Sequence, residues 1–376
     1  MDIYKKNSIE ELLCYCALIM LFAIKGMGDI SKSIPLKLIL FVACLLLVTK
    51  LLVMNWTWRE LVCTIYINLL GIIVWIFSGE YSIFITILVI TSLKDINIKT
   101  ALKICFWSAI IFFMIHMLLI LIGIFDGELS YSLDDGIRKR YGLGYGHANS
   151  AHSFVTTIIF LGILAYKDRL KISHYMLLGV FNLMIYQFTD SRTGMLLSLF
   201  GICSTYILYL VNKFNLIKYI DIIIQNKFVK FFISNTFIII TILAFIMCWL
   251  YAKYGMFGKL GTLSSRFFNA SRVIENNKIT LFGQRNIDTD LGYVYILYKY
   301  GGVFWSSWLI AYSLLLRKII ENKLYIECMI VICFAIYSII ECFTGSILAN
   351  ITLIFISFLI YPNNLKMYKN KLSKDK

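Results

Sequence analysis

The amino-acid sequence predicts an all-α fold, a polytopic membrane bundle of about twelve spanning helices that forms one integral membrane domain over residues 1–376. Apolar residues make up 60% of the chain and charged residues only 15%, whereas a soluble domain is about one quarter charged. Apolar runs of helical length recur along the whole chain and are separated mostly by short polar connections. No reading as a soluble domain fits these observations.

The predicted spans follow the apolar runs in chain order. They cover residues 8–24, 34–54, 60–77, 80–93, 101–125, 147–166, 172–189, 193–211, 229–252, 291–316, 325–345 and 347–361. The fourth span is the weakest because it is short for a hydrocarbon core of about 30 Å, and Lys94 and Asp95 would extend it as snorkelling ends. Two connections are long, 126–146 and 253–290, and the second is the large loop of the protein.

The basic residues predict the orientation, because short lysine-rich connections stay on the cytoplasmic side of a membrane. Lysines near residues 5–6, 94–103, 167–171, 213–230 and 366–376 fit the predicted spans when both termini are cytoplasmic. Both long connections then lie outside the cell. We expect a multi-pass protein of the bacterial inner (plasma) membrane, since the surplus of isoleucine, lysine and asparagine is typical of a bacterial genome of low GC content.

The remaining features of composition exclude other classes. A net charge of +15 could indicate nucleic-acid binding, but the basic residues are scattered between apolar runs, so we expect no nucleic-acid partner. All ten cysteines lie within or at the edge of apolar runs, and no Cys-x-x-Cys occurs. We therefore expect them to be core residues, with no metal site. No secretory cleavage pattern follows the first residues of the chain.

Arginine departs from the lysine pattern. Of the nine arginines, six are predicted to lie outside: Arg138, Arg140, Arg192, Arg266, Arg272 and Arg285. The planar guanidinium binds two phosphate oxygens at once, whereas lysine offers a point charge. This bias predicts an anionic ligand on the outer face. The alternative is pairing with nearby acids such as Asp134, Asp135 or Glu275.

The first candidate site is the outer segment 138–152, which contains three spaced glycines and ends with a histidine. The glycines predict a flexible loop whose backbone can approach a ligand closely, and Asn149 or Ser150 can cap the helix that follows. A glycine loop that leads into a helix N-terminus favours an anion. His147 and His152 are five residues apart and do not form a metal-binding face, so each is either a site residue or an interfacial residue bonded to backbone.

The second candidate site is the predicted outer turn Thr-Asp-Ser-Arg-Thr-Gly at residues 189–194. Ser191 can cap the next helix, and Arg192 then lies in the first helical turn. A cation there opposes the helix dipole, and a bound anion would remove the conflict. The alternative is an ordinary turn.

The third candidate site combines the late loop with the span that follows it. Arg266 and Arg272 are six residues apart, so they either face different sides of a straight helix or clamp a ligand from a bent segment. Asp290 precedes a span, where an aspartate can cap a helix or act as a general base. Lys299 lies inside the predicted membrane, which makes it either a functional residue with Glu341 as its partner or a snorkelling lysine.

In their order and sidedness these motifs resemble the Wzy-type polysaccharide polymerases of the O-antigen polymerase and ligase superfamily, over about the C-terminal two-thirds of the chain. The matching pieces are Gly-Leu-Gly-Tyr-Gly-His-Ala-Asn ending at Asn149, Ser191-Arg192-Thr193-Gly194, Arg272 followed by Leu281-Phe282-Gly283, and Asp290-Leu291-Gly292-Tyr293 with Gly301-Gly302 downstream. Ala148 stands where the family has proline, and Leu291 where it has asparagine.

The resemblance implies a GT-C-like membrane glycosyltransferase that needs no metal or cofactor. Such enzymes transfer a glycan from undecaprenyl pyrophosphate to the non-reducing end of a lipid-linked repeat unit. The resemblance implies that pyrophosphate is held by Arg192, Arg266 and Arg272, with Arg140 as a further candidate. Asp290 or His147 would be the base, and Asn149, His152, Lys299 and Glu341 are further site candidates. The implied partners are the undecaprenyl-pyrophosphate-linked oligosaccharide, membrane lipid, a flippase and a chain-length regulator.

Two other functions stay open from the sequence. A flippase for lipid-linked oligosaccharides would also have about twelve spans, although two related halves and short outer loops would be expected of it. A ligase that transfers the glycan to a different acceptor would share the same motifs. The sugars, the linkage and the oligomeric state leave no mark that we can identify in the sequence.

Overall fold

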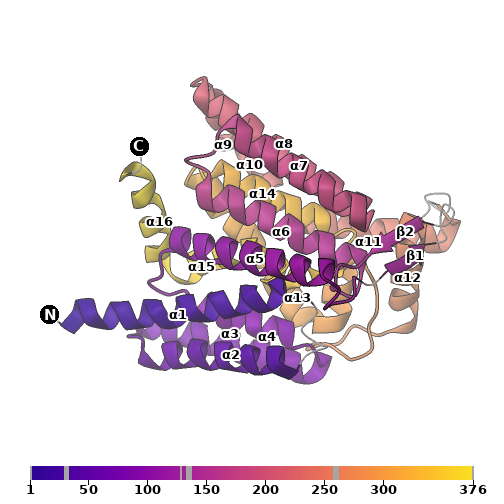
Figure 1. Cartoon of the computed structure of the whole chain (residues 1–376), viewed down its shortest axis with the longest axis horizontal. Coiled ribbons are helices and arrows are strands. Elements are labelled where there is room, and N and C mark those ends of the chain that lie inside the picture. The colour runs from indigo at the N-terminus through magenta and orange to yellow at the C-terminus, as the bar shows by residue number, and fades with distance from the viewer. Residues whose placement is uncertain (1, 29–33, 128, 133–137, 257–261, 375–376) are drawn as a thin grey trace. The chain divides into compact units, whose positions relative to one another are not determined.

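The computed structural model describes residues 2–28, 34–127, 129–132, 138–256 and 262–374, and this part of the chain is nearly all helical (Figure 1). Its contacts divide it into two compact units. Unit 1 comprises Met1–Thr64, Leu88–Ile202 and Ile360–Lys376, and unit 2 comprises Ile65–Ile87 and Cys203–Leu359. The chain therefore leaves unit 1 twice, returns to it twice and ends in it.

Seven helices in the described residues are long and apolar enough to cross a membrane. They are α2 (Ile34–Val53), α3 (Trp58–Ser78), α5 (Ile98–Leu121), α6 (Ala148–Tyr166), α8 (Arg192–Lys213), α11 (Thr236–Tyr254) and α13 (Gly292–Glu321). All seven coincide with predicted spans, so the all-α, multi-pass class is confirmed at this level. The number twelve stays a prediction.

Helices also form at the other predicted spans, although these are shorter or more polar. They are α1 (Asp2–Gly26), α4 (Tyr81–Ser92), α7 (Ile172–Thr189), α14 (Tyr325–Tyr337) and, at the last span, the 3₁₀ helix η3 (Ile351–Ile356) followed by α15 (Ser357–Ile360). The chain ends with the polar helix α16 (Pro362–Lys374), which belongs to unit 1.

Unit 1 is built around α6, whose side chains are almost all buried. Helix α5 packs on α6, α1 packs on both α5 and α2, and α7 packs on the other side of α6 (Figure 1). The apolar content of α6 is ordinary, but both its polar and its apolar side chains are buried, as expected of a helix at the centre of unit 1. Helices α1, α5, α6 and α7 therefore form the core of unit 1. They are distant in the sequence from α16, the last helix of this unit.

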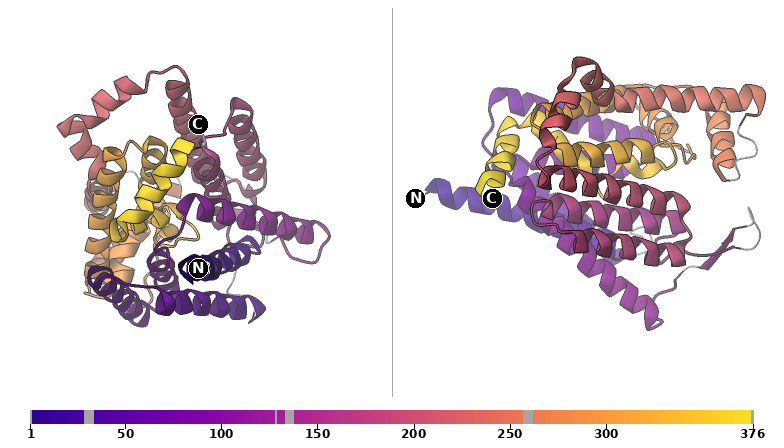
Figure 2. Two further views of the ribbon diagram at one scale, coloured as in Figure 1. Left: turned by 90° about the vertical axis from the view of Figure 1, so that its left-hand side faces the viewer. Right: turned by 90° about the horizontal axis from the view of Figure 1, so that it is seen from above.

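Unit 2 is built around α13, which α11 and α14 contact along its length. Helix α12 (Thr262–Asn276) connects α11 to the loop before α13, and Phe267 and Ala270 of α12 pack with Cys248, Leu291 and Val294 in one apolar cluster. The short helices α9 (Ile217–Gln225) and α10 (Lys227–Ser234) lie across the direction of the long helix α11 (Figure 2).

The two predicted spans at 325–345 and 347–361 are not continuous helices. After α14 the chain forms turns and the 3₁₀ helix η2 (Cys342–Gly345) before η3 begins. The physical reason is a buried polar network that satisfies the freed backbone. Asn350 Nδ2 donates to Thr344 O and to the hydroxyl of Tyr312, each at 2.9 Å. Non-helical backbone at membrane depth is tolerated where protein buries it in this way.

One further predicted span needs correction, and the two long connections contain secondary structure. The predicted span 229–252 is divided at Asn235 into α10 and α11. The connection 126–146 contains a hairpin of β1 (Leu129–Ser132) and β2 (Arg138–Tyr141), in which Leu129 pairs with Tyr141. The connection 253–290 contains α12. Asp134 and Asp135, the acids considered as arginine partners, lie outside the described residues.

Candidate functional site

Helix α13 is interrupted at Gly301, whose φ of 86° lies outside the helical region. The loop before α13 forms backbone hydrogen bonds with the α13 residues on both sides of this interruption. Gln284 N donates to Lys299 O, Gly302 N to Thr280 O, and Val303 N to Leu281 O, over 3.2, 2.9 and 3.1 Å. The loop therefore satisfies the backbone groups that the kink removes from the helical ladder.

Glycine is required on both sides of this junction. A β-carbon at Gly301 would lie 2.4 Å from both Gly283 N and Leu281 O, and one at Gly283 would lie 2.2 Å from Lys299 O. Both glycines also have positive φ, which other residues adopt only at a cost. The motif pieces Leu281-Phe282-Gly283 and Gly301-Gly302 are thus the two halves of one backbone joint.

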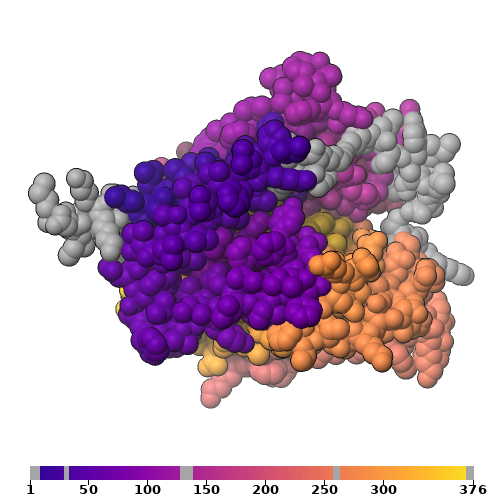
Figure 3. All heavy atoms as spheres, turned by 90° about the horizontal axis from the view of Figure 1, so that it is seen from below, coloured from indigo at the N-terminus to yellow at the C-terminus, as the bar shows by residue number. Residues whose placement is uncertain are grey.

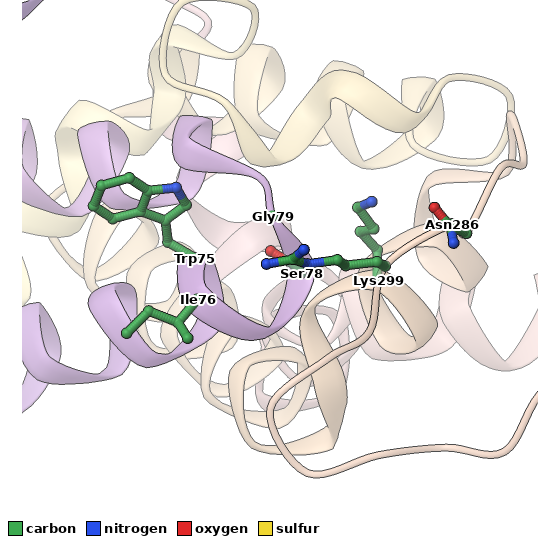
Figure 4. A pocket seen from close by; sticks show the side chains of 7 residues that line it. Trp75, Ile76, Ser78, Gly79, Asn286 and Lys299 are labelled. Carbon is green, nitrogen blue, oxygen red and sulfur yellow. The ribbon is translucent and has the colours of Figure 1, made fainter.

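The two segments that meet at this joint form one wall of a cavity of about 560 Å³. The cavity is lined by Trp75, Ile76, Ser78, Gly79, Arg285, Asn286 and Lys299, all in unit 2 (Figure 4). Phe282 packs on Phe77 with ring centroids 6.1 Å apart, so the loop contacts the end of α3. Figure 3 shows in orange the surface of the part of unit 2 that contains this loop.

The charge of this cavity is basic. The Arg285 side chain lies along Gly79, where an added β-carbon would be 3.7 Å from Arg285 Nε. Lys299 lies between Asn286 and the turn at Ser78 and Gly79 (Figure 4). Within the part of the chain that the structure describes, neither cation pairs with an acidic side chain. Two cations with no carboxylate among the lining residues, beside an exposed tryptophan, suit an anion that carries an apolar or sugar group.

The predicted pair of Lys299 and Glu341 does not form, because Glu341 pairs with Arg266 instead. Arg266 Nη2 donates to Glu341 Oε1 at 3.0 Å, and Arg266 Nη1 also donates to Ile340 O. The Glu341 side chain is 5% exposed and that of Arg266 is 11% exposed. Arg266 is therefore a buried cation that is held by a carboxylate and a carbonyl, and it stabilises the irregular segment that follows α14.

Asp290 lies beside this pair. Its Oδ2 is 3.9 Å from Arg266 Nε, and its side chain is half exposed. The N-cap position of α13 belongs to Leu291, so the capping role considered for Asp290 is wrong. A carboxylate that is open to solvent on one side and faces a guanidinium on the other can accept a proton from a bound hydroxyl. Its role as a general base stays a prediction.

Arg272 lies on another face of α12. A straight helix turns residues six apart by about 120° from each other, and α12 is one helix from Thr262 to Asn276. Arg272 is exposed, with its guanidinium carbon 5.5 Å from the centre of the Phe268 ring. The clamp by Arg266 and Arg272 from a bent segment is therefore wrong. Arg272 remains available to a ligand at the surface.

Unit 1 brings two of the sequence motifs together. Arg140 on β2 donates from Nη2 to Asn149 Oδ1 at 2.6 Å and from Nε to Thr189 O at 3.2 Å. The hydroxyl of Ser191 donates to the same Asn149 oxygen at 3.1 Å. Asn149 thus connects the glycine segment to the turn between α7 and α8. Arg192 is the first residue of α8 and is exposed, as the sequence predicts.

His152 is fully buried below this network and is a packing residue of three helices. Its Nε2 is 2.9 Å from Asn182 Oδ1 and its Nδ1 is 3.0 Å from Thr189 Oγ1. Asn182 Nδ2 donates to Met195 O, which fixes the amide so that Nε2 carries the proton. A β-carbon at Gly194 would lie 2.5 Å from the His152 ring. The His152 side chain is therefore enclosed by the described part of the protein.

The glycine segment itself is closed rather than open to a ligand. Leu143 and Tyr145 are buried, and the Tyr145 hydroxyl donates to Gly26 O at 2.9 Å. His116 Nε2 lies 3.0 Å from Leu143 O. The capping residue of α6 is His147, whose Nδ1 accepts from Asn149 N at 3.1 Å, so the prediction of Asn149 or Ser150 as the cap is wrong. His147 is exposed, and its role as a base stays a prediction.

The candidate residues therefore belong to two units. Unit 1 contains Arg140, His147, Asn149, His152 and Arg192, and unit 2 contains Arg266, Arg272, Asp290, Lys299 and Glu341. A chamber shared by Arg192, Arg266 and Arg272 stays a prediction. Sequence reasoning counted Arg285 among the outer arginines but gave it no role, and it missed the turn at Ser78 and Gly79. A glycine directly after an apolar span was the available signal.

No group of three or more histidine, cysteine, aspartate or glutamate side chains within the described ranges could hold a metal ion. The fold and the basic cavity define a multi-pass helical membrane protein with an anion-compatible site at the interrupted helix α13. Comparison with protein families, with curated proteins and with solved structures finds no match to this chain.

Proposed function

We propose that the protein is a polysaccharide polymerase that transfers a glycan from undecaprenyl pyrophosphate to the non-reducing end of a lipid-linked repeat unit. The observation that carries the proposal is the basic cavity, where Arg285 and Lys299 face one space without an acidic partner in the described residues. The resemblance of the motifs to Wzy-type polymerases supplies the substrate class. The reaction takes place on the outer face of the bacterial plasma membrane.

The predicted topology supports a site on the outer face. Span 60–77 begins at the cytoplasmic Arg59 and ends at Ser78 and Gly79, and the connection 253–290 follows an inside-to-outside span. Both walls of the cavity are thus predicted on the same side, where the lipid-linked glycan is available and ATP is not.

The chemistry requires a leaving group and a base. In the transfer, an acceptor hydroxyl bonds to the anomeric carbon of the donor sugar while the bond to the pyrophosphate oxygen breaks. Arg285 and Lys299 stabilise the charge that develops on the departing diphosphate. Asp290, whose Oδ2 lies 3.9 Å from Arg266 Nε, accepts the hydroxyl proton. Neither step uses a cofactor, and a flippase and a chain-length regulator are the partners we propose.

Activity in a defined membrane tests the proposal. Purified protein in proteoliposomes with polyprenyl-pyrophosphate-linked repeat units should produce a ladder of longer glycans. Arg285→Ala and Lys299→Met should each reduce polymer formation by roughly 100-fold, the usual loss when one donor to a developing anion is removed. Lys278→Ala is the matched control, since this exposed lysine lies in the same connection and does not line the cavity.

Three outcomes would contradict the proposal. Movement of the lipid-linked glycan across the bilayer without chain growth would establish a flippase. Full activity of both the Arg285 and the Lys299 variants would place the diphosphate elsewhere, with Arg192 and Arg272 as the next residues to change. Transfer to a non-lipid acceptor would identify a ligase.

A further inference from the structure

A second cavity in unit 2, of about 570 Å³, lies between α10 and the last turns of α13. It is distant in the sequence from the loop and kink that form the first cavity. Lys227 and Lys230 of α10 and Arg317 of α13 line it. The sequence places Lys227 and Arg317 in connections predicted to be cytoplasmic, and Lys230 at the cytoplasmic end of the predicted span 229–252. This cavity and the first one are therefore predicted on opposite membrane faces.

The cations of this cavity are only partly neutralised. Glu321 Oε1 accepts from Lys230 Nζ at 2.7 Å and from Arg317 Nε at 3.2 Å, so two cations share one carboxylate. Lys227 is exposed and forms no ion pair within the described ranges. Three cations against one carboxylate leave an excess of positive charge at the cavity.

Two hydroxyl groups in the same cavity lack protein partners. Ser234 Oγ and Ser313 Oγ are buried and have no hydrogen-bond partner in the described part of the chain, and Ser234 is only 7% exposed. A buried hydroxyl without a partner costs about 1–3 kcal/mol. An anionic ligand in the cavity would accept hydrogen bonds from both hydroxyls and from the cations, which offers a physical reason for this arrangement.

The surroundings of the cavity are apolar. Phe231 and Leu314 line it, and both are largely exposed at the surface of the unit. Helix α10 also exposes Phe228 and Phe232, and α9 exposes Ile222 and Ile223. Short helices with lysines on one side and large apolar residues on the other are typical of the membrane interface, where they lie at the level of the lipid headgroups.

We infer that the cavity between α10 and α13 binds the phosphate of an anionic membrane phospholipid. The excess charge attracts the phosphate, the two serines and Lys227 donate to its oxygens, and the phenylalanines of α10 contact the acyl chains. The exposed apolar rim favours a lipid over a soluble phosphate compound, because a soluble ligand would leave that rim uncovered. The site does not depend on the proposed transferase activity.

Native mass spectrometry of the delipidated protein tests this inference. Phosphatidylglycerol should bind as one tight adduct, and phosphatidylcholine should bind at least tenfold more weakly. Lys227→Ala combined with Ser234→Ala should weaken phosphatidylglycerol binding by about tenfold, since a charge-assisted donor and a neutral donor are lost. Lys213→Ala is the matched control, because this exposed lysine ends α8 and does not line the cavity.

Three results would overturn the inference. Equal binding of both phospholipids would remove the role of charge. Unchanged phosphatidylglycerol binding by a folded double variant would place the lipid elsewhere. Displacement of phosphatidylglycerol by millimolar glycerol phosphate or inorganic phosphate would identify a site for a soluble phosphate compound instead. The thermal unfolding of each variant, measured in the same detergent, establishes that it is folded.

Discussion

Arg266 and Arg272 differ in environment although they share α12. Arg266 is buried against Glu341 and the carbonyl of Ile340, whereas Arg272 lies exposed over Phe268. Removing one partner of a buried pair leaves an uncompensated charge, which costs more than the pair itself contributes. The same type of substitution in the two arginines should therefore have different consequences.

We expect Arg266→Ala to lower the free energy of unfolding by about 3–5 kcal/mol. Arg272→Ala should change it by no more than about 0.5 kcal/mol, as surface substitutions usually do. Unfolding by SDS in mixed micelles measures both. Loss of polymer in Arg266→Ala would then follow from loss of folded protein. In Arg272→Ala it would follow from loss of a ligand contact.

The double variant Arg266→Met with Glu341→Met separates charge from packing. It removes both members of the pair and should be more stable than Arg266→Ala or Glu341→Ala alone. If all three variants are equally destabilised, the buried charges are not the cause and the account of this pair is incorrect.

Helix α13 owes its shape to a segment outside itself. The loop 280–284 bonds to the backbone on both sides of Gly301, so the kink and the loop form one structural element. The adjacent glycines in this helix have different surroundings. A β-carbon at Gly302 would meet nothing closer than Thr280 O at 3.8 Å, whereas at Gly301 the nearest atoms are 2.4 Å away.

Gly301→Ala should therefore detach the loop. The substitution adds a cost of about 1–3 kcal/mol for a backbone conformation that is essentially restricted to glycine, and a collision with Gly283 and Leu281. Hydrogen–deuterium exchange of a peptide covering 279–286 should become much faster, and the first cavity should lose its anion affinity.

Gly302→Ala is the matched control and should leave both the exchange and the affinity unchanged. If the loop exchanges as slowly in Gly301→Ala as in the native protein, the backbone joint does not hold the loop in place.

On the scale of the whole molecule, the number of membrane crossings determines the sides of the termini. Seven crossings would put the two termini on opposite sides, whereas the twelve predicted spans put both in the cytoplasm. The helices α1, α4, α7 and α14, and the segment formed by η3 and α15, account for the difference.

Reporter fusions test this topology. Alkaline phosphatase fused after Lys278 should be active, because the late connection is predicted outside the cell. Green fluorescent protein fused after Asn322 or at the C-terminus should fluoresce, since both positions are predicted in the cytoplasm. Fluorescence after Lys278 would reverse the orientation and would put the basic cavity on the wrong side for a lipid-linked glycan donor.

Hydropathy predicted the helical class and the bounds of most helices, because an apolar run inside a membrane satisfies its own backbone hydrogen bonds by forming a helix. It could not predict the breaks at Gly301 and at residues 338–350, where Asn350 and the loop backbone supply hydrogen bonds that apolarity does not reveal. The motif spacing located Asp290 and the glycine pairs. It could not distinguish the buried Arg266 from the exposed Arg272, since that difference depends on which face of α12 meets Glu341.

The joint between the loop and α13 is made by main-chain atoms, and only its two glycines are restricted in identity. Residues 281 and 284 can therefore exchange side chains while the backbone frame that holds the loop stays constant. A single backbone architecture could in this way accept a different lipid-linked sugar by substitution at a few loop positions, with no change in how the helices pack.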